Sequence, residues 1–298
     1  MIANPAAGRG RGGRVLPAVR ELLRTAGIHE VRVTTAPGEE QRLARDAATA
    51  GAETIIALGG DGTWSKVARG ILESERDARL VIMAAGTGND FGHSLGLPAA
   101  DYAAMTRIAI SPRSERIDLG RMDGHAFLNV AGAGIATEVL QAIQSPSLLR
   151  GSLRYLAAAI PRLHRFGAIG ARICCDDMAR GDPASYLAII ASNGTRFGGG
   201  FRVAPHASVQ DGLLDLITVR DASLPRRAAL LVRARFGRHL AESEVGHAHI
   251  RRCVVTFSEP PVLDVDGELV RAASNAVEIE CVTRALRLGL PGEAQKKP

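Results

Sequence analysis

Apolar residues along the first 110 or so positions alternate between two spacings. Three short aliphatic runs have the length and composition of buried strands: Val31–Thr34, Thr54–Leu58 and Leu80–Ala84. The segments around them repeat apolar residues every three or four positions, as helices do: Val15–Thr25, Glu39–Ala50 and Ser65–Leu72. This alternation predicts a parallel sheet flanked by helices, whose ligands bind beyond the carboxyl ends of the strands.

The pattern changes after residue 115. Arg116–Met122 and Ala126–Val130 flank Asp123-Gly124, a dipeptide that favours a two-residue hairpin turn. Further strand candidates follow between turn residues: Ala171–Cys175, Tyr186–Ser192, Leu213–Val219, Cys253–Phe257, Val262–Val265 and Val277–Cys281. They predict an antiparallel β-sandwich that is interrupted by two basic helices, Ser152–Phe166 and Leu224–Leu240. We therefore expect an α/β domain over residues 1–115, a sandwich domain over 116–282, and a segment 283–298 that returns to the first domain.

Composition narrows the class of protein. With 298 residues and 46% hydrophobic content, the chain can bury a sizeable core. No apolar run approaches the roughly 20 residues that span a bilayer, and the N-terminus lacks the pattern of a secretion signal. The four cysteines form no CxxC pair, so we expect reduced thiols in a cytoplasmic protein.

The chain is basic, with a net charge of +6. Such a balance suits nucleic acid, an anionic membrane or a phosphorylated substrate. We find no zinc-ligand spacing and no recognition motif, and aromatic residues make up only 4%, so nucleic acid is not an expected partner. The two basic helices have the pattern of helices that lie on anionic membranes, but ordinary surface helices of a basic protein share it.

Two glycine-rich motifs each follow a predicted buried strand. They are Gly59-Gly60-Asp61-Gly62-Thr63 and Gly86-Thr87-Gly88-Asn89-Asp90-Phe91. Glycines let the backbone approach a ligand closely, and the N–H groups that begin a helix favour phosphate. Asp61 adds a carboxylate that can hold Mg²⁺ or orient a hydroxyl. Either motif alone also fits a tight turn, but two of them at neighbouring strand ends predict a nucleotide site.

Gly8, Gly10 and Gly13 match the GxGxxG fingerprint of dinucleotide-binding folds, which is a weak signal. The preceding strand is very short, and no acidic residue ends the next one. We expect instead a basic loop over Gly8–Arg14, lying either near phosphate or lipid headgroups or simply in solvent.

In this order and spacing, the motifs resemble the catalytic domain of the diacylglycerol kinases, a superfamily with bacterial lipid kinases and the sphingosine and ceramide kinases. The resemblance begins at Asn4-Pro5 and extends over nearly the whole chain. Later matching segments are Asn193 with Gly198–Gly200, Pro205, Asp211–Asp215 and Asp266–Glu268. It implies an ATP-binding α/β domain of the NAD kinase and diacylglycerol kinase type, and an ATP-dependent kinase that phosphorylates a hydroxyl of diacylglycerol or a related membrane lipid.

The resemblance also implies roles for individual residues. ATP contacts would come from Asn4, Thr34, Gly59, Gly60, Asp61, Gly62, Thr63, Ser65, Gly86, Thr87 and Asn89. Asp61, which would also be catalytic, would form a carboxylate network around Mg²⁺ with Asp90 and Asp118. A second Mg²⁺ would be held by Asp211 with the carbonyls of Ser208 and Leu213. Asp266 and Glu268 would supply the general base.

The implied partners are ATP, a lipid and, transiently, the cytoplasmic face of a membrane. Related bacterial kinases are often dimers, so a homodimer is one expected form. The sequence departs from the family at Trp64-Ser65-Lys66, where an apolar residue and Asn-Glu are usual, and at Gly92-His93, where Ala-Arg is usual. Two alternatives remain open: an NAD kinase, which shares the Gly-Gly-Asp-Gly-Thr loop, and a catalytically inactive nucleotide- or lipid-binding regulator, which the Ser65-Lys66 departure favours.

Overall fold

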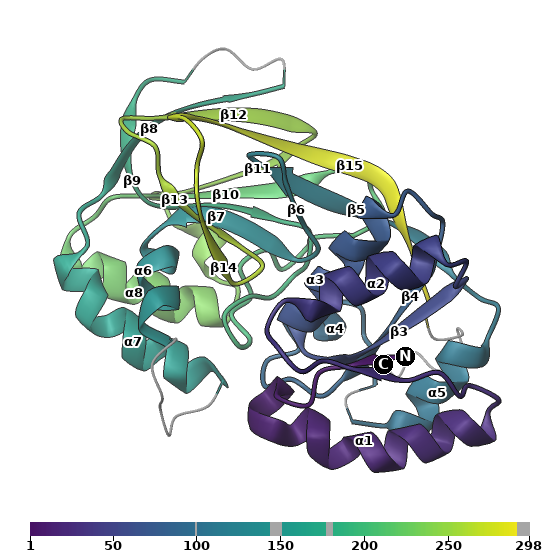
Figure 1. Cartoon of the computed structure of the whole chain (residues 1–298). Helices are drawn as coiled ribbons and strands as arrows, with labels where there is room; N and C mark the ends of the chain where they lie inside the picture. Colours follow the sequence, from purple (N-terminus) through teal and green to yellow (C-terminus); the bar gives the residue numbers. More distant parts are fainter. Residues whose placement is uncertain (99, 144–150, 177–180, 291–298) are drawn as a thin grey trace. The chain divides into compact units, whose positions relative to one another are not determined.

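The computed structural model describes residues 1–98, 100–143, 151–176 and 181–290, without the side chains of residues 151, 152 and 154 (Figure 1). The chain divides into two compact units. One contains Met1–Ile117 together with the segment that begins at Arg284, and the other contains Asp118–Thr283. None of the described helices is long and apolar enough to cross a membrane.

The first unit is a parallel sheet in the order β15–β4–β3–β1–β2. Its strands are β1 (Ile2–Ala3), β2 (Arg32–Val33), β3 (Thr54–Gly59), β4 (Arg79–Ala84) and the end of β15 (Ala276–Leu288), whose Arg287 and Leu288 pair with β4. Its helices are α1 (Ala7–Thr25), α2 (Glu39–Thr49), α3 (Asp61–Glu73), α4 (Asp90–Ser94) and α5 (Tyr102–Ile110).

The sequences of β3 and β4 are continuous aliphatic runs because both faces of these strands are buried. Every residue of β4, and all but the first of β3, is buried, as expected for a parallel strand covered on both faces. Helices α2 and α3 pack on one face of the sheet, and α1 and α5 lie on the other (Figure 1). The predicted α/β architecture is confirmed.

The predicted loop over Gly8–Arg14 is wrong in extent. Only Gly8, Arg9 and Gly10 leave helical dihedral angles, and residues 11–14 already belong to α1. Gly12 serves close packing rather than a turn, because a Cβ atom there would lie 2.1 Å from the carbonyl oxygen of Asn4. In a sequence, a run of glycines usually indicates a flexible loop. Here Gly12 has a different role, because its missing side chain leaves room for a neighbouring backbone.

The second unit is built mainly from antiparallel strands. They are β5 (Glu115–Met122), β6 (His125–Phe127), β7 (Val130–Gly134), β8 (Ile169–Cys175), β9 (Ala184–Ser192), β10 (Leu214–Arg220), β11 (Val245–Ile250), β12 (Arg252–Phe257), β13 (Val262–Val265), β14 (Glu268–Arg271) and most of β15. Its helices are α6 (Ile135–Ile143), α7 (Gly151–Arg165), α8 (Leu224–Arg235) and the short η1 (His239–Ala241).

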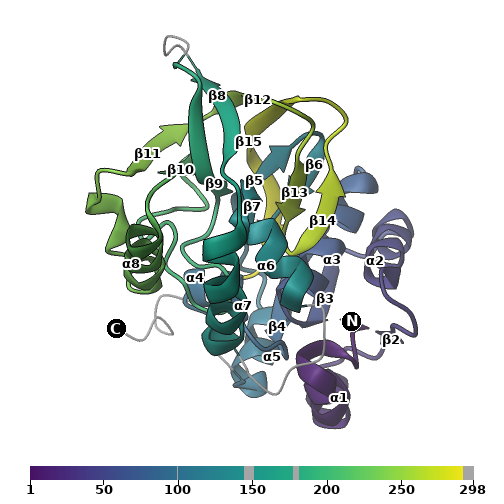
Figure 2. The same cartoon turned by 90° about the vertical axis from the view of Figure 1, so that its left-hand side faces the viewer.

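The predicted antiparallel sandwich is also confirmed. In β12 exposed and buried residues alternate strictly, with Cys253, Val255 and Phe257 facing the core. The predicted hairpin joins β5 to β6 through Asp123 and Gly124, both at positive φ, as a two-residue turn of this kind requires. In Figure 2, α7 lies between α6 and α8, and it packs against both helices.

Some features were missed from the sequence. The elements α5, α6, β11 and β14 were not predicted, because their apolar patterns are short or mixed with polar residues. The expectation of reduced thiols is wrong for one pair: Cys175 of β8 and Cys253 of β12 lie opposite each other in register and form a disulfide. They are 78 residues apart, so only the strand pairing brings them together.

The packing of α2 against α3 depends on Gly70. A Cβ atom at this position would lie 2.1 Å from the carbonyl oxygen of Gln41 in α2. We expect Gly70→Ala to lower the free energy of unfolding by about 1–3 kcal/mol, since overpacking outweighs the gain in helix propensity. Urea unfolding followed by circular dichroism measures this change. Gly62→Ala, in the same helix with open space around it, is the matched control, and equal stability of both variants would contradict the packing argument.

Candidate active site

Two loops at the carboxyl ends of β3 and β4 touch through their backbones. A Cβ atom on Gly60 would lie 2.8 Å from Cα of Gly86, and one on Gly86 would lie 2.5 Å from Cα of Gly60. The N–H groups of Ala85 and Gly86 donate to the carbonyl of Gly59, at 2.6 and 3.0 Å. Only glycine fits at Gly60 and Gly86, so both predicted motifs form one surface.

The turn after β1 joins this surface. Gly8 packs against the second loop so closely that a Cβ atom would lie 2.2 Å from the carbonyl oxygen of Ala85. Nη1 of Arg11 donates to the carbonyl of Gly86 at 3.4 Å. The basic turn therefore lies at the glycine loops, and its proximity to phosphate or lipid headgroups stays a prediction.

Asn4 ties the end of β1 to α2 and α3. Its Nδ2 donates to Oε1 of Glu40 at 2.8 Å and to Oγ1 of Thr63 at 3.0 Å. Glu40 is buried and was not singled out from the sequence, where it is one acidic residue among several at the start of a helix. Its importance follows from burial beside Asn4, which no local pattern indicates.

Asp61, Gly62 and Thr63 form the first turn of α3 instead of a separate loop. The first N–H groups of a helix have no carbonyl one turn earlier, and they concentrate partial positive charge. The glycines beside this turn leave its backbone open to close approach, since nothing lies within 4 Å of a Cβ atom built on Gly62. This end of α3 is suited to bind phosphate.

Two carboxylates converge beside that helix end. A Cβ atom built on Gly88 would lie 3.5 Å from Oδ2 of both Asp61 and Asp90. Oδ1 of Asp61 accepts a hydrogen bond from the N–H of Phe91 at 2.9 Å, which fixes it against α4. Burial and then the nearby Asp90 carboxylate raise the pKa of Asp61 to about 6. Two repelling carboxylates with oxygens aimed at one place fit a divalent cation.

The other predicted nucleotide residues lie around these loops in different environments. Asn89, at positive φ, braces its own loop, since its side chain accepts from the N–H of Gly86 and donates to its carbonyl. Thr34 is buried and its N–H donates to the carbonyl of Ala3. Thr87 is exposed, whereas Ser65 is buried within α3. A direct contact with ATP is therefore more accessible to Thr87 than to Ser65.

The second unit brings Asp118 to the loop over residues 208–213. Oδ2 of Asp118 accepts from the N–H of Gly212 at 2.8 Å, and its own N–H donates to the carbonyl of Val209 at 2.7 Å. Oδ1 of Asp211 accepts from the N–H of Leu213 at 3.0 Å. Burial, Asp118 and Asp211 together raise the pKa of Cys281 to about 12. Asp118 thus lies beside the loop that was predicted to hold the second Mg²⁺.

Asp266 and Gly267 form a tight turn between β13 and β14, both at positive φ. The Asp266 carboxylate accepts from the N–H groups of Leu128, Asn129 and Val130, at 2.6, 2.9 and 3.0 Å. It therefore fixes the start of β7. Glu268, two positions on and partly exposed, opens β14.

A third carboxyl group in this hairpin was missed from the sequence. Asp264 is 2% exposed, and its Oδ1 accepts from the N–H of Gly267 at 2.8 Å. Burial, with a smaller effect of Asp266, raises the pKa of Asp264 to about 7. An acidic residue inside the apolar run Val262–Val265 was the available signal.

An apolar cavity of about 140 Å³ lies between helices α6, α7 and α8 and the sheet of the second unit. Its lining includes Ile135, Val139, Ala159, Leu187, Phe201 and Leu230. The polar groups at its wall are neutral or engaged: burial lowers the pKa of His239, and the Arg227 guanidinium donates to the carbonyls of Leu163 and Phe166. The cavity is suited to hydrocarbon rather than to a charged molecule.

Two family models match the chain. Residues 1–122 match the diacylglycerol kinase catalytic domain, and residues 129–289 match the YegS C-terminal NAD kinase beta sandwich-like domain. Over 282 residues, the chain is 34% identical to a Xanthomonas euvesicatoria protein named "Probable lipid kinase YegS-like", with 91% of this chain and 90% of the relative covered. Over 271 residues it is 29% identical to a Bacillus subtilis protein named "Diacylglycerol kinase", with 90% and 88% covered.

Solved structures share the fold. A diacylglycerol kinase from Bacillus anthracis matches with a TM-score of 0.74 at 21% identity, over 98% of this chain and 96% of that chain. An NAD kinase from Archaeoglobus fulgidus in complex with ATP is a more distant match, with a TM-score of 0.56 at 14% identity, over 98% and 93%. At these identities the likeness shows the fold alone.

The raised pKa of Asp264 predicts how stability depends on pH. Between its usual value of 3.8 and about 7, the folded chain keeps a proton that the unfolded chain releases, so stability falls as pH rises through this window. At about 1.4 kcal/mol per pKa unit, the loss is at most about 4 kcal/mol. Asp264→Asn, which cannot ionise, should flatten this dependence in urea unfolding between pH 5 and pH 8. The exposed Asp182→Asn is the control, and a wild-type slope in Asp264→Asn would refute the assignment.

Proposed function

Because the chain belongs to the family of bacterial lipid kinases built on a diacylglycerol kinase catalytic domain, we propose that it transfers the γ-phosphate of ATP to a hydroxyl of diacylglycerol or a related membrane lipid. The resemblance inferred from the sequence motifs is thereby confirmed.

The apolar cavity of the second unit is the observation that supports a lipid acceptor. Apolar cavities of about 150 Å³ stay dry and take up hydrocarbon molecules. This cavity, at about 140 Å³, suits part of an acyl chain. NAD is a charged dinucleotide and would leave its polar groups without partners there. A lipid acceptor is therefore favoured over NAD.

The glycine loops of the first unit are the proposed ATP site. The first turn of α3 would bind phosphate oxygens through N–H groups of Gly62 and Thr63, with Gly59, Gly60 and Gly86 leaving room for close approach. Asn4 and Thr87 would contact the nucleotide directly. Thr34, Ser65 and Asn89 would contribute mainly by bracing the loops, since they are buried in this structure.

Asp61 and Asp90, both in the first unit, are the proposed holders of the catalytic Mg²⁺. A cation bound there would neutralise charge on the transferred phosphate, which is the main demand of phosphoryl transfer. The chain's own part is to aim the two oxygens at one place, which the bond from the N–H of Phe91 to Asp61 enforces. The loop of Ser208, Asp211 and Leu213 is proposed to hold a second, structural Mg²⁺.

The β13–β14 hairpin is the proposed source of the general base. The Asp266 carboxylate accepts hydrogen bonds from three N–H groups and holds the start of β7, which suits it to a positioning role. Asp266 would hold the hairpin in place while Glu268 accepts the proton of the lipid hydroxyl.

Helices α7 and α8 are the proposed membrane-facing surface. Exposed large apolar side chains recur on both helices or at their ends: Leu153, Ile160, Leu224, Val232 and Phe236. Arg165 and Arg238 are exposed near them and would attract anionic lipid headgroups. The same helices line the apolar cavity, so a lipid has a short path from the membrane into it.

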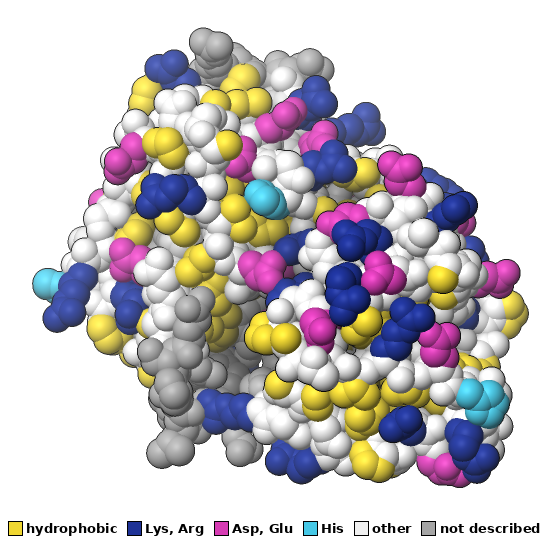
Figure 3. All heavy atoms as spheres, viewed as in Figure 1, with side chains coloured by type: hydrophobic (Ala, Val, Ile, Leu, Met, Phe, Trp, Pro, Cys, Tyr) yellow, Lys and Arg dark blue, Asp and Glu magenta, His cyan; other side chains and the backbone are white. Residues whose placement is uncertain are grey.

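The charges of the described surface are mixed, and on α8 itself Arg226, Arg227 and Arg233 pair with acidic side chains. On the face drawn in Figure 3, dark blue Lys and Arg side chains are interspersed with magenta Asp and Glu side chains, without a continuous basic track among the described atoms. In the first unit, Arg24 pairs with Glu21 and Arg42 pairs with Glu39 and Asp46. This mixed distribution disfavours binding to a nucleic acid backbone.

The catalytic proposal predicts the effect of Asp61→Asn. With γ-labelled ATP, Mg²⁺ and vesicles containing diacylglycerol, the wild-type chain should label the lipid. The variant should be at least about 100-fold slower, because it loses one of two carboxylates that neutralise charge around the phosphates. Asp46→Asn, an exposed surface acid on α2, should keep wild-type activity. Thin-layer separation of the labelled lipids measures both.

Further substrates separate the alternatives. Monoacylglycerol, phosphatidylglycerol and a sphingoid base are offered in parallel with NAD. Label in NAD and in no lipid would replace the proposal by an NAD kinase. Nucleotide binding without transfer to any acceptor would indicate a nucleotide-binding regulator and direct attention to Ser65 and Lys66.

The membrane proposal predicts the effect of replacing two exposed apolar residues of one surface. Val232→Ser with Phe236→Ser should weaken sedimentation with phosphatidylglycerol vesicles by about tenfold, because both side chains lose apolar contact with the bilayer. Higher salt should weaken binding of the wild-type chain as well. Ile110→Ser, at an exposed position of the first unit, is the control. Equal sedimentation of all three proteins would rule out this surface.

A further inference from the structure

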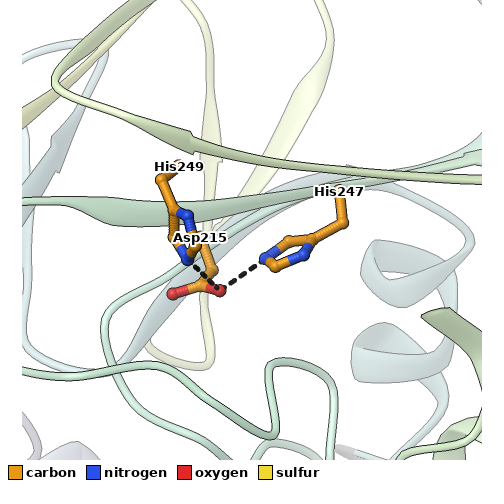
Figure 4. A group of neighbouring side chains, drawn as sticks. All are labelled: Asp215, His247 and His249. Carbon is orange, nitrogen blue, oxygen red and sulfur yellow. Dashed lines mark hydrogen bonds and ion pairs between the residues drawn. The ribbon is translucent and has the colours of Figure 1, made fainter.

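A carboxylate and two imidazoles meet on one face of the β10–β11 pair. In the antiparallel register Asp215 lies opposite His249, and Ile217 lies opposite His247. Successive residues of a strand point to opposite faces, so His247 and His249 share a face with Asp215. Figure 4 shows both rings turned toward the carboxylate of Asp215. Nε2 of His247 is 2.6 Å from Oδ1 of Asp215, and Nε2 of His249 is 3.6 Å from the same oxygen.

The three residues differ in exposure. The side chain of Asp215 is 3% exposed, that of His247 is 24% exposed and that of His249 is 51% exposed. A buried carboxylate is costly unless a positive charge accompanies it. A cation held between the carboxylate and the imidazole nitrogens would supply that positive charge. The exposure of His249 leaves a route for a cation from solvent.

The donor atoms have the spacing of a metal site. One ligand atom from each of the three residues lies within 4.8 Å of the others. Zinc bonds of about 2.0–2.1 Å in a tetrahedron place neighbouring ligand atoms about 3.3 Å apart. The distances of 2.6 and 3.6 Å from Asp215 lie on either side of this value, so small side-chain rotations would suffice. Two residues on one strand and one on its neighbour also form a rigid frame.

The donor set selects the kind of metal. Imidazole nitrogens favour zinc, cobalt, nickel and copper, whereas Mg²⁺ prefers oxygen ligands and retains its waters. We propose that Asp215, His247 and His249 form a binding site for a divalent transition metal of the zinc class. The site has three protein ligands, which leaves the fourth position for water or another small ligand.

The proposed metal site would stabilise β11, which is an edge strand. In the described part of the chain, β11 pairs with β10 alone, so it has a free edge. A metal held by both strands would join β11 to the sheet. The effect would extend to the apolar cavity, because Val245 at the start of β11 and His239 just before it both line the cavity. The proposed site is therefore a structural support for the cavity wall, separate from the oxygen ligands proposed for Mg²⁺.

The experiment uses the full chain without an affinity tag, freed of metal by EDTA and dialysis. Titration calorimetry with ZnCl₂ in 5 mM MgCl₂ measures affinity and stoichiometry. We expect one zinc per chain that Mg²⁺ does not displace, and a rise of several degrees in Tm. Co²⁺ added instead should give the visible absorption bands of a tetrahedral site with nitrogen ligands.

The variants distinguish this site from other zinc ligands. His249→Ala changes a half-exposed side chain, so the fold should persist, and it should weaken zinc binding at least tenfold and abolish the rise in Tm. His125→Ala and His206→Ala, at exposed positions outside the cluster, should bind zinc as the wild-type chain does. Absent zinc binding, or equal binding in His249→Ala, would overturn the proposal and leave a simple Asp–His ion pair. Lipid kinase activity, measured separately in Mg²⁺, does not enter this outcome.

Discussion

The backbone contact between Gly60 and Gly86 is the constraint on which the geometry of the first unit depends. Each glycine occupies the place where the other would have a side chain, so the ends of β3 and β4 can continue as loops in contact. That contact positions Asp61 to accept from the N–H of Phe91 and leaves it near Asp90. The repulsion between the two carboxylates, and the helix end beside them, then give the unit its capacity for a cation and for phosphate.

Buried or half-buried carboxylates recur in the second unit, and their surroundings give each a different role. Asp266 accepts hydrogen bonds from three backbone N–H groups and fixes the start of β7. Asp264 has one such bond and little exposure, so its pKa rises to about 7. Asp215 faces two imidazoles across the β10–β11 pair. The same functional group is thus structural in Asp266, proton-binding in Asp264 and a proposed metal ligand in Asp215, according to its neighbours.

The alternation of side chains along the strands divides the second unit into two regions. Leu216, Ala191 and Ile250 face the core of the sandwich. Ala188, Ile190 and Val219 point the other way and line the apolar cavity. Asp215 and the two histidines lie on this second face: His247 shares a row with Ile217 and Ile190, and the Asp215–His249 pair lies two residue pairs further along. The proposed lipid cavity and the proposed metal site therefore belong to one sheet face, and a change in β11 would reach both.

Local sequence patterns were sufficient to predict the strands β3, β4 and β12, the hairpin at Asp123-Gly124 and the two glycine motifs, because each depends on residues close together in the chain. They also determined the family, since these motifs recur in a fixed order. Tertiary structure alone decided that Glu40 meets Asn4, that Asp264 is buried, that Cys175 faces Cys253, and that His247 and His249 meet Asp215. These features arise from strand register and burial, which join residues 32 to 78 positions apart and which no local pattern specifies.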